Sequence, residues 1–507
     1  MSSPPTASLR PITPDAFGYE QARHLLLRAG FGGDPNQIRT LADWGPKRAV
    51  KHLIEVGAIE GYPEPRANSF EGDLMRQPTP EELREYRRAQ ERGDEERVAQ
   101  FRARRQRMQR ADRSQIRSMQ RWWLERMIES PKPLEEKMTL FWHGHFATSY
   151  RAIEHSYQMF LQNQLFRSHA LGNFGSMLFR IIRDPAMIRY LNNDRNVARS
   201  PNENLARELM ELFSLGEGNY SERDIKEGAR ALTGYSFSEN DFLFVPDRHD
   251  QGSKRILGRS GNMDGDDFVR AILEQRDCSE FIASKLYRFF VRELPASRDD
   301  PDAKPVSAIL RRLAATFRGS RYEIAPMLEQ LLLSEHFYDP SNLQRQIKSP
   351  AELVVGAVRS MRTPVRDLGI LVDAMDLMGQ SLFFPPNVAG WEGGRSWVNT
   401  STLFVRQNIL NFLLTGKTPS GYDAMASVER YDPMVLLDDL RETDPDADRS
   451  PQKVVSYLLR FMLGGEPTPD KMRTLVGFIE GHGGRVTPDV VTGTLALIAA
   501  MPEYQLC

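Results

Sequence analysis

The residues best suited to metal chemistry in this sequence are His143 and His145, which a single glycine separates. On a continuous helix, two side chains at this spacing diverge by about 160°. We expect Gly144 to break the helix that begins at Pro133, so that both imidazole rings point the same way along an extended segment. This arrangement is common in metal sites. The neighbouring aromatic residues also permit a buried, hydrogen-bonded histidine pair.

A second group of candidate residues belongs to a short predicted helix. Ser200 at the N-cap, a proline at the first helical position and Glu203 at the third predict the start of this helix, with Glu203 assigned to capping. The helix is predicted to run to Leu215 and to end at Gly216, because glycine readily adopts the left-handed conformation of a helix terminus.

One side of this predicted helix carries Asn204, Glu208 and Glu211, at positions i, i+4 and i+7. The opposite side is apolar and would pack on the core. The oxygen donors predict a metal or acid/base site, and a solvated polar face is the alternative. With His143 and His145, the two glutamates are the predicted ligands of a divalent metal ion. Nitrogen and carboxylate ligands without thiolates suit zinc, iron or manganese.

Two irregular segments supply the remaining candidates. His249 and Asp250 are adjacent in a loop, and they are predicted to act as an acid/base pair or as further ligands. The segment 379–408 combines prolines, glycines, tryptophans and asparagines, which suit the binding of sugars or peptides. The alternative is a structural plug that closes the core. The predicted substrate-binding residues are Asn204, Asn387, Trp391, Trp397 and Asn399.

The composition restricts the class of protein. The chain has 507 residues, 27% of them charged, and a formal net charge of −1, which is typical of a soluble globular protein. Two cysteines far apart in sequence predict neither a disulfide framework nor a cysteine-based zinc site. No apolar run has membrane-spanning length, and the N-terminus lacks the regions of a signal peptide. We therefore expect a cytoplasmic location, with export alongside a partner left open.

One segment departs from the balanced charge. Arg97 to Arg121 holds nine arginines and one acidic residue, Asp112. The segment predicts either a surface for nucleic acid or an acidic partner, or a solvated helix that the acidic residues 81–96 compensate. The solvated helix is favoured because Phe101 is the single aromatic side chain among these arginines before Trp122, and nucleic acid is not an expected partner.

The periodicity predicts a mainly α fold, with a multi-helix core, a small β-hairpin region after Gly234 and irregular loops. We divide the chain into four parts. Residues 1–62 are an N-terminal helical segment, and residues 63–130 are a linker and a long charged helix. Residues 131–410 are a helical core with the candidate site, and residues 411–507 are a C-terminal helical segment.

Several long motifs together resemble one family, the bacterial proteins called domain of unknown function 1800. The motifs are PLEEKMTLFWHGHFATS, DPAMIRYLNN, PNENLARELMELFSLGEGNYSERDIKEGARALTGY, RHDQGSKRILG, KSPAELVVGAVR, GQSLFFPPNVAGWEGGRSWVNTSTL and PEYQLC. The resemblance covers about residues 17–507 and implies a predominantly helical bacterial protein without a settled reaction. Many members of the family appear beside a phosphatase- or sulfatase-like family of exported proteins and carry export signals.

Two functional hypotheses follow from these residues and this resemblance. The first is a metal-dependent enzyme, with hydrolysis by metal-bound water favoured over oxidoreduction. The second is a non-catalytic binding or assembly protein that partners a phosphatase- or sulfatase-like protein. In the second, the histidines and glutamates belong to buried networks.

Overall fold

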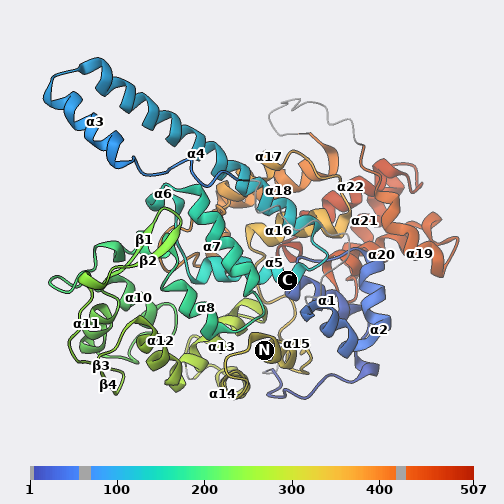
Figure 1. The fold of residues 1–507 in the computed structure, drawn as a ribbon. Helices are drawn as coiled ribbons and strands as arrows, with labels where there is room; N and C mark the ends of the chain where they lie inside the picture. The colour runs from blue at the N-terminus through green and yellow to red at the C-terminus, as the bar shows by residue number, and fades with distance from the viewer. Residues whose placement is uncertain (1–4, 56–69, 298, 418–429) are drawn as a thin grey trace.

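Amphipathic helices make up most of the computed structural model, which describes residues 5–55, 70–297, 299–417 and 430–507 (Figure 1). The mainly α fold is confirmed, and the only strands among the described residues form two small antiparallel pairs. Each helix in this part of the chain is too short or too polar to cross a membrane.

The first half of the chain forms α1 (Tyr19–Ala29), α2 (Pro35–Ile54), α3 (Pro80–Glu91), α4 (Glu95–Glu129), α5 (Pro133–His145), α6 (Tyr150–Ile153), α7 (Ser156–Ser168), α8 (Phe174–Ile181), α9 (Pro185–Tyr190), α10 (Asn204–Glu211) and α11 (Glu222–Ala231). The strands are β1 (Tyr235–Ser238), β2 (Asp241–Phe244), β3 (Lys254–Ile256) and β4 (Arg259–Gly261). The second half forms α12 (Gly265–Glu274), α13 (Arg276–Phe290), α14 (Ala303–Gly319), α15 (Ile324–Leu332), α16 (Pro350–Met361), α17 (Leu368–Leu377), α18 (Thr400–Thr415), α19 (Asp438–Thr443), α20 (Pro451–Leu463), α21 (Pro469–Gly481) and α22 (Pro488–Ala499).

Local sequence explains many of these boundaries. Ser221 and Ser349 each form a capping box with an acidic residue three positions later, which satisfies the first amides of α11 and α16. Gly93 has a φ of 67° and separates α3 from α4, so the long charged segment folds back as a helical hairpin. The expected β-hairpin region is present, with Tyr235 opposite Phe244 in the first hairpin.

The centre of the structure is α5, which is buried on nearly every side. It packs against α1, α2, α4 and α7. A helix with buried residues on all its sides is typical of such a central position, and the buried polar residues of α5 must therefore find partners within the protein. Its one buried carboxylate, Glu136, accepts hydrogen bonds from Arg126 of α4 and Arg167 of α7 at 2.8–2.9 Å. The indole of Trp123 donates a further bond at 3.1 Å, so one side chain joins three helices.

Two local predictions were wrong. The helix α5 continues through Gly144 to His145, because the buried position of this segment favours the regular hydrogen bonds of a helix. The helix predicted from Ser200 starts at Asn204 instead, and it ends at Glu211. The Asn196 side chain accepts from the amide of Asn202 at 2.9 Å and holds the preceding residues in a loop.

The Glu136 cluster generates a stability prediction. Glu136→Gln leaves Arg126 and Arg167 buried without their counter-charge, so the free energy of unfolding should fall by about 3–5 kcal/mol. Urea unfolding at neutral pH measures this change. Glu135→Gln is the matched control. The carboxylate of Glu135 is next to Glu136 in sequence, but it is half-buried and forms no ion pair in the described part of the chain. Equal effects of the two substitutions would contradict the assigned role of Glu136.

Candidate functional site

The two histidines of α5 lie in its last turn and face different surroundings. The amide of Phe383 donates to Nε2 of His143 at 3.1 Å, and the ring packs against Trp123 and Trp391. Nε2 of His145 lies 3.0 Å from the carbonyl oxygen of Phe213, to which it donates. Burial lowers the pKa of each imidazole to about 3, so both rings are neutral at physiological pH.

The predicted stripe on α10 is half-buried. Tyr220 donates its hydroxyl proton to Glu211 at 2.9 Å. Burial, together with the nearby Glu211 carboxylate, raises the pKa of Glu208. Arg207 does not neutralise either residue by an ion pair, because its guanidinium binds Glu203 and Glu222. The remaining member, Asn204, is exposed at the start of the helix.

These residues do not form a ligand set as they are arranged. The continuous helix directs His143 and His145 apart, and one nitrogen of each ring is hydrogen-bonded to the backbone. Within the described ranges, no three histidine, cysteine, aspartate or glutamate side chains come together as a metal site would require. We therefore derive no reaction step through a metal ion at these positions.

The predicted binding loop covers the end of α5. Gly390 has a φ of 80°, and a Cβ added there would lie 2.0 Å from the carbonyl oxygen of Gly144. The Trp391 ring lies 5.6 Å from the His143 ring between centroids. Its indole nitrogen is buried without a hydrogen-bond partner in the described chain. The contacts of this part of the loop are those of a plug that closes the core.

The other predicted residues of the loop have local structural roles. Trp397 is buried, and its carbonyl oxygen accepts from the hydroxyl of Thr402 at 3.0 Å. Asn399 caps the start of α18, since its side chain accepts from the amide of Thr402. Asn387 accepts from the amide of Ala389 within a turn. The structure thus brings Trp391 to His143, and the two asparagine side chains stabilise the backbone next to them.

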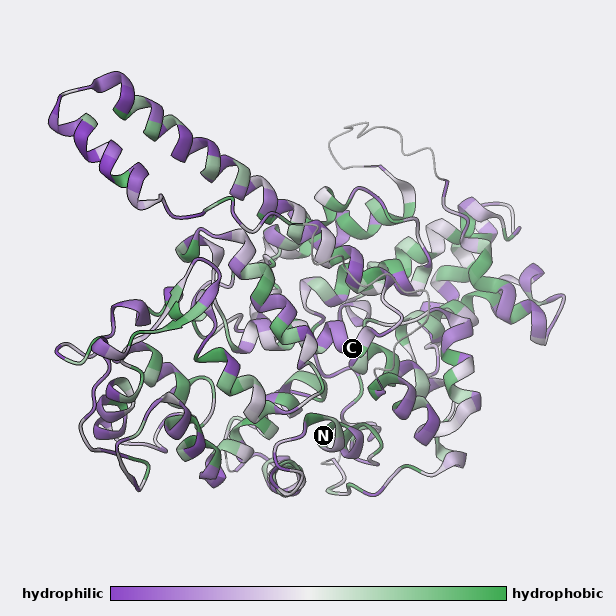
Figure 2. Ribbon diagram, viewed as in Figure 1, coloured by the Kyte–Doolittle hydropathy of each residue, from purple (hydrophilic) through white to green (hydrophobic). Residues whose placement is uncertain are grey.

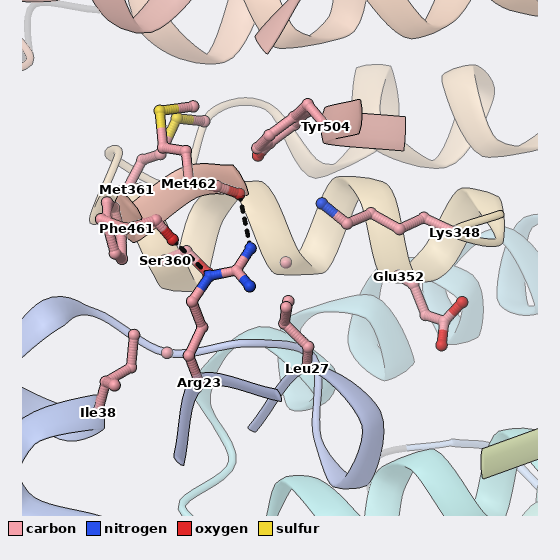
Figure 3. A pocket seen from close by; sticks show the side chains of 12 residues that line it. Arg23, Leu27, Ile38, Lys348, Glu352, Ser360, Met361, Phe461, Met462 and Tyr504 are labelled. Carbon is pink, nitrogen blue, oxygen red and sulfur yellow. Dashed lines mark hydrogen bonds between the residues drawn. The ribbon is translucent and has the colours of Figure 1, made fainter. Parts of the chain in front are cut away.

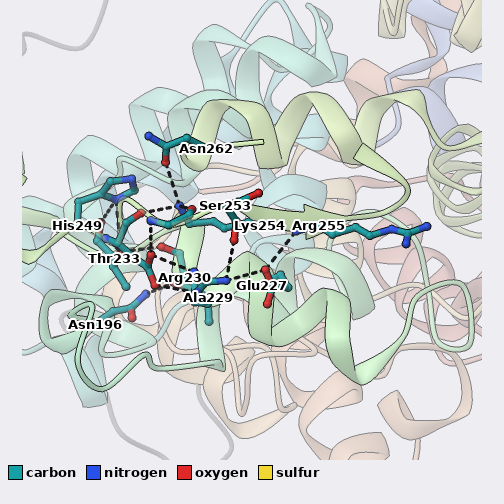
Figure 4. Close-up of polar contacts among 12 residues, drawn as sticks. Asn196, Glu227, Ala229, Arg230, Thr233, His249, Ser253, Lys254, Arg255 and Asn262 are labelled. Carbon is teal, nitrogen blue, oxygen red and sulfur yellow. Dashed lines mark hydrogen bonds and ion pairs between the residues drawn. The ribbon is translucent and has the colours of Figure 1, made fainter. Parts of the chain in front are cut away.

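His249 and Asp250 belong to a polar network at the end of α11 (Figure 4). Nδ1 of His249 donates to the carbonyl oxygen of Thr233 at 2.8 Å. The Thr233 hydroxyl accepts from the amide of Asp250 at 2.8 Å. Asp250 forms a two-pronged ion pair with Arg230, at 2.7 and 3.1 Å. The hydrogen-bonded guanidinium of Arg230 lowers the pKa of Asp250, which keeps this carboxylate ionised and unsuited to donate a proton.

Two cations complete the network, and neither was among the predicted site residues. Arg230 also binds Glu227 at 2.8 Å, and Lys254 donates to the carbonyl oxygens of Asp250 and Gly252 at 2.5 and 3.1 Å. Both cations lie within motifs quoted above, ARALTG and RHDQGSKRILG. The positive charge of Arg230 and Lys254 in these motifs could have indicated a role in this network. Sequence spacing does not show which loop each side chain contacts.

The comparisons with known proteins agree with the resemblance inferred from the motifs. A family model described as a protein of unknown function (DUF1800) matches residues 24–506. No curated protein and no solved structure matches the chain.

Because His143 and His145 are buried in their neutral form, the free energy of unfolding should decrease at acidic pH. The pKa of His143 is near 3 in the folded state and about 6.5 when unfolded, so protons bind preferentially to the unfolded state between these values. Its contribution is complete above about pH 6.5 and is lost as the pH falls. His143→Gln should reduce the slope of unfolding free energy between about pH 4.5 and 6 by about 1.4 kcal/mol per pH unit. Urea titrations at several pH values measure it.

The exposed His482 provides the control for this prediction, because His482→Gln removes a histidine from a solvated position. That substitution should leave the slope unchanged. A slope that is identical in the wild type and the His143 variant would mean that His143 is protonated equally in both states.

Proposed function

The chain belongs to the DUF1800 family of proteins of unknown function, and from that premise we propose that it is a binding or assembly protein. Its partner docks on the helical hairpin of α3 and the outer part of α4, residues 80–111, which we call the arm. The observation that carries this proposal is that a long, positively charged element extends away from the core.

The arm has almost no contact with the rest of the protein. Figure 1 shows it projecting from the body, and Figure 2 shows that its residues are largely hydrophilic. Among residues 80–111 only Ala89 is buried. The hairpin is held by its own contacts, which include the ion pair of Arg104 with Glu82 at 2.6 Å and the packing of Tyr86 against Phe101. Stabilising the core does not require an element of this kind.

The outward face of the arm carries positive charge. Arg102, Arg107 and Arg110 lie within about 140° of one another around α4, on the side opposite Phe101. All three are exposed, and none forms an ion pair in the part of the chain that the structure describes. No acidic residue occurs between Arg97 and Asp112, so this face offers a continuous positive surface.

An acidic protein surface fits the arm better than nucleic acid does. The arginine face lacks aromatic side chains on which bases could stack, and the arm also carries acidic residues on α3, among them Glu81, Glu85 and Glu91. Mixed charge of this kind favours a partner with complementary charges at defined positions. We take a phosphatase- or sulfatase-like protein as the candidate partner, because many members of the family that the chain resembles appear beside such proteins.

Charge reversal on the arm tests this proposal. The triple substitution of Arg102, Arg107 and Arg110 to glutamate should weaken binding to a purified phosphatase- or sulfatase-like partner at least about tenfold, because like charges would face each other. Isothermal titration calorimetry at two salt concentrations measures the affinity. Wild-type binding should weaken with salt, whereas the variant should show a smaller salt dependence.

A matched triple variant controls for net charge. Arg223, Arg248 and Arg311 are exposed and lie outside the arm, and changing them to glutamate alters the total charge equally. This variant should bind like the wild type. Equal losses in both variants, or preferential binding of duplex DNA or anionic vesicles over the protein partner, would contradict the proposal.

A metal-dependent hydrolase is the second candidate. The half-buried carboxylates of Glu208 and Glu211 favour it, since neither forms an ion pair in the described ranges. This hypothesis predicts about one equivalent of zinc, iron or manganese in protein purified without a metal-affinity tag. The double substitution of Glu208 and Glu211 to glutamine should remove the metal. Elemental analysis decides, and a protein that neither contains nor takes up metal eliminates this candidate.

A further inference from the structure

A small cavity lies where α1, α16 and the C-terminal 3-10 helix η8 (Pro502–Gln505) meet. Its volume is about 30 Å³, whereas one water molecule requires roughly 10–15 Å³. The charged and hydroxyl side chains that line it are Arg23, Lys348, Glu352, Ser360 and Tyr504 (Figure 3). They come from distant parts of the sequence, so only the folded chain forms this cavity.

Three hydrogen-bond donors of this cavity have no acceptor in the described protein: the ammonium of Lys348 and the hydroxyls of Ser360 and Tyr504. The guanidinium of Arg23 lines the same cavity, and the carboxylate of Glu20 is the acidic group that acts on it most strongly. Arg23 is held in place by Nε and Nη2, which donate to the carbonyl oxygens of Phe461 and Met462 at 2.7 and 2.8 Å. The Lys348 ammonium lies 3.9 Å from the centre of the Tyr504 ring. Lys348 is 6% exposed and Arg23 8% exposed, so solvent hydrates both cations poorly.

The one carboxylate of the cavity wall is already bound elsewhere. Glu352 accepts from Lys137 at 2.8 Å and lies 3.6 Å from Arg28. Figure 3 shows its carboxylate pointing away from the ends of Arg23 and Lys348. A further buried cation, Arg406, lies behind Lys348 and donates to its carbonyl oxygen at 2.7 Å. Glu20 balances part of the charge of Arg23, whereas the ammonium of Lys348 forms no ion pair among the described residues.

We propose that this cavity binds a small oxyanion, the carboxylate or phosphoryl group of a small molecule. A guanidinium, an ammonium and two hydroxyls supply donors to one compact volume, and charge-assisted bonds to an anion would satisfy them together. The proposal is independent of partner binding at the arm, because the cavity belongs to the core.

The charge state of Lys348 gives the site a pH signature. Burial is the largest effect and lowers the pKa of Lys348 to about 8. Of the groups that face it, Arg23 and Arg406 lower the pKa further, while Cys507 and Glu352 raise it. Because the ammonium form binds the anion, affinity is full below about pH 8 and falls as the pH rises through this value. An exposed lysine keeps its charge until about pH 10.

Calorimetry with two simple anions tests the proposal. Sulfate represents a phosphoryl group and acetate a carboxylate, and both keep a constant charge from about pH 6 to 9. Chloride at matched ionic strength is the reference. Lys348→Met should weaken binding about tenfold or more, and Tyr504→Phe roughly threefold to tenfold. The matched control is Lys47→Met, which removes an exposed lysine and should bind like the wild type.

The melting temperature without added anion shows whether Lys348→Met is folded. It should not fall below that of the wild type, because the folded-state pKa of Lys348 lies below the unfolded value and the buried charge is unfavourable below about pH 8. Binding of sulfate alone assigns a phosphoryl ligand, and binding of acetate alone assigns a carboxylate. The proposal is overturned if neither anion binds the wild type at about 10 mM, or if the folded Lys348 variant binds equally well.

Discussion

The structure depends most on the buried carboxylate of Glu136. Removing a carboxylate from water is costly, and only the converging guanidiniums of Arg126 and Arg167 make this burial tolerable. Burial opposes ionisation, but the two arginines outweigh it and hold the pKa of Glu136 below its ordinary value. The cluster fixes α4 and α7 on α5. Since the arm is the outer continuation of α4, the direction in which it leaves the body also depends on this cluster.

Sequence patterns predicted the elements whose signals are local. Ser221 and its capping partner define the start of α11 within the chain itself. Gly93 has a conformation that few other residues adopt, and it separates α3 from α4 within the segment for which the sequence predicted a single long charged helix. The sequence signals for a helix end at Gly144 and a helix start at Ser200 were equally strong, but tertiary contacts outweighed them. Gly144 stays helical because its segment is buried, with the distant Gly390 backbone packed against it, and Ser200 stays outside the helix because Asn196 organises the loop. Asn196 lies only six residues before Asn202, but a helix-start pattern does not show that its side chain binds this amide.

The sequence indicates which residue types could form a site, but it does not indicate which of these residues lie close together in the folded protein. His143, His145 and Glu208 are ligands in principle, and in the structure each of the two histidines forms a hydrogen bond with a backbone group of the core. Conversely, Lys348 is part of the motif KSPAELVVGAVR, and nothing near it in sequence indicates that Arg23 and Tyr504 line the same cavity. Such a site depends on contacts between segments that no periodicity relates, so only the tertiary structure shows it.

Although the net charge is only −1, the protein has two positively charged regions, the arm and the cavity, and their charges differ in exposure to solvent. The arginines of the arm are exposed, so their interactions act through water and are screened within about 8–10 Å at physiological ionic strength. Lys348 and Arg23 are surrounded by protein, where charges interact more strongly and salt screens them less. Binding at the arm should therefore vary steeply with ionic strength, whereas binding in the cavity should vary mainly with pH. The two dependences separate a surface contact from a buried site in the same protein.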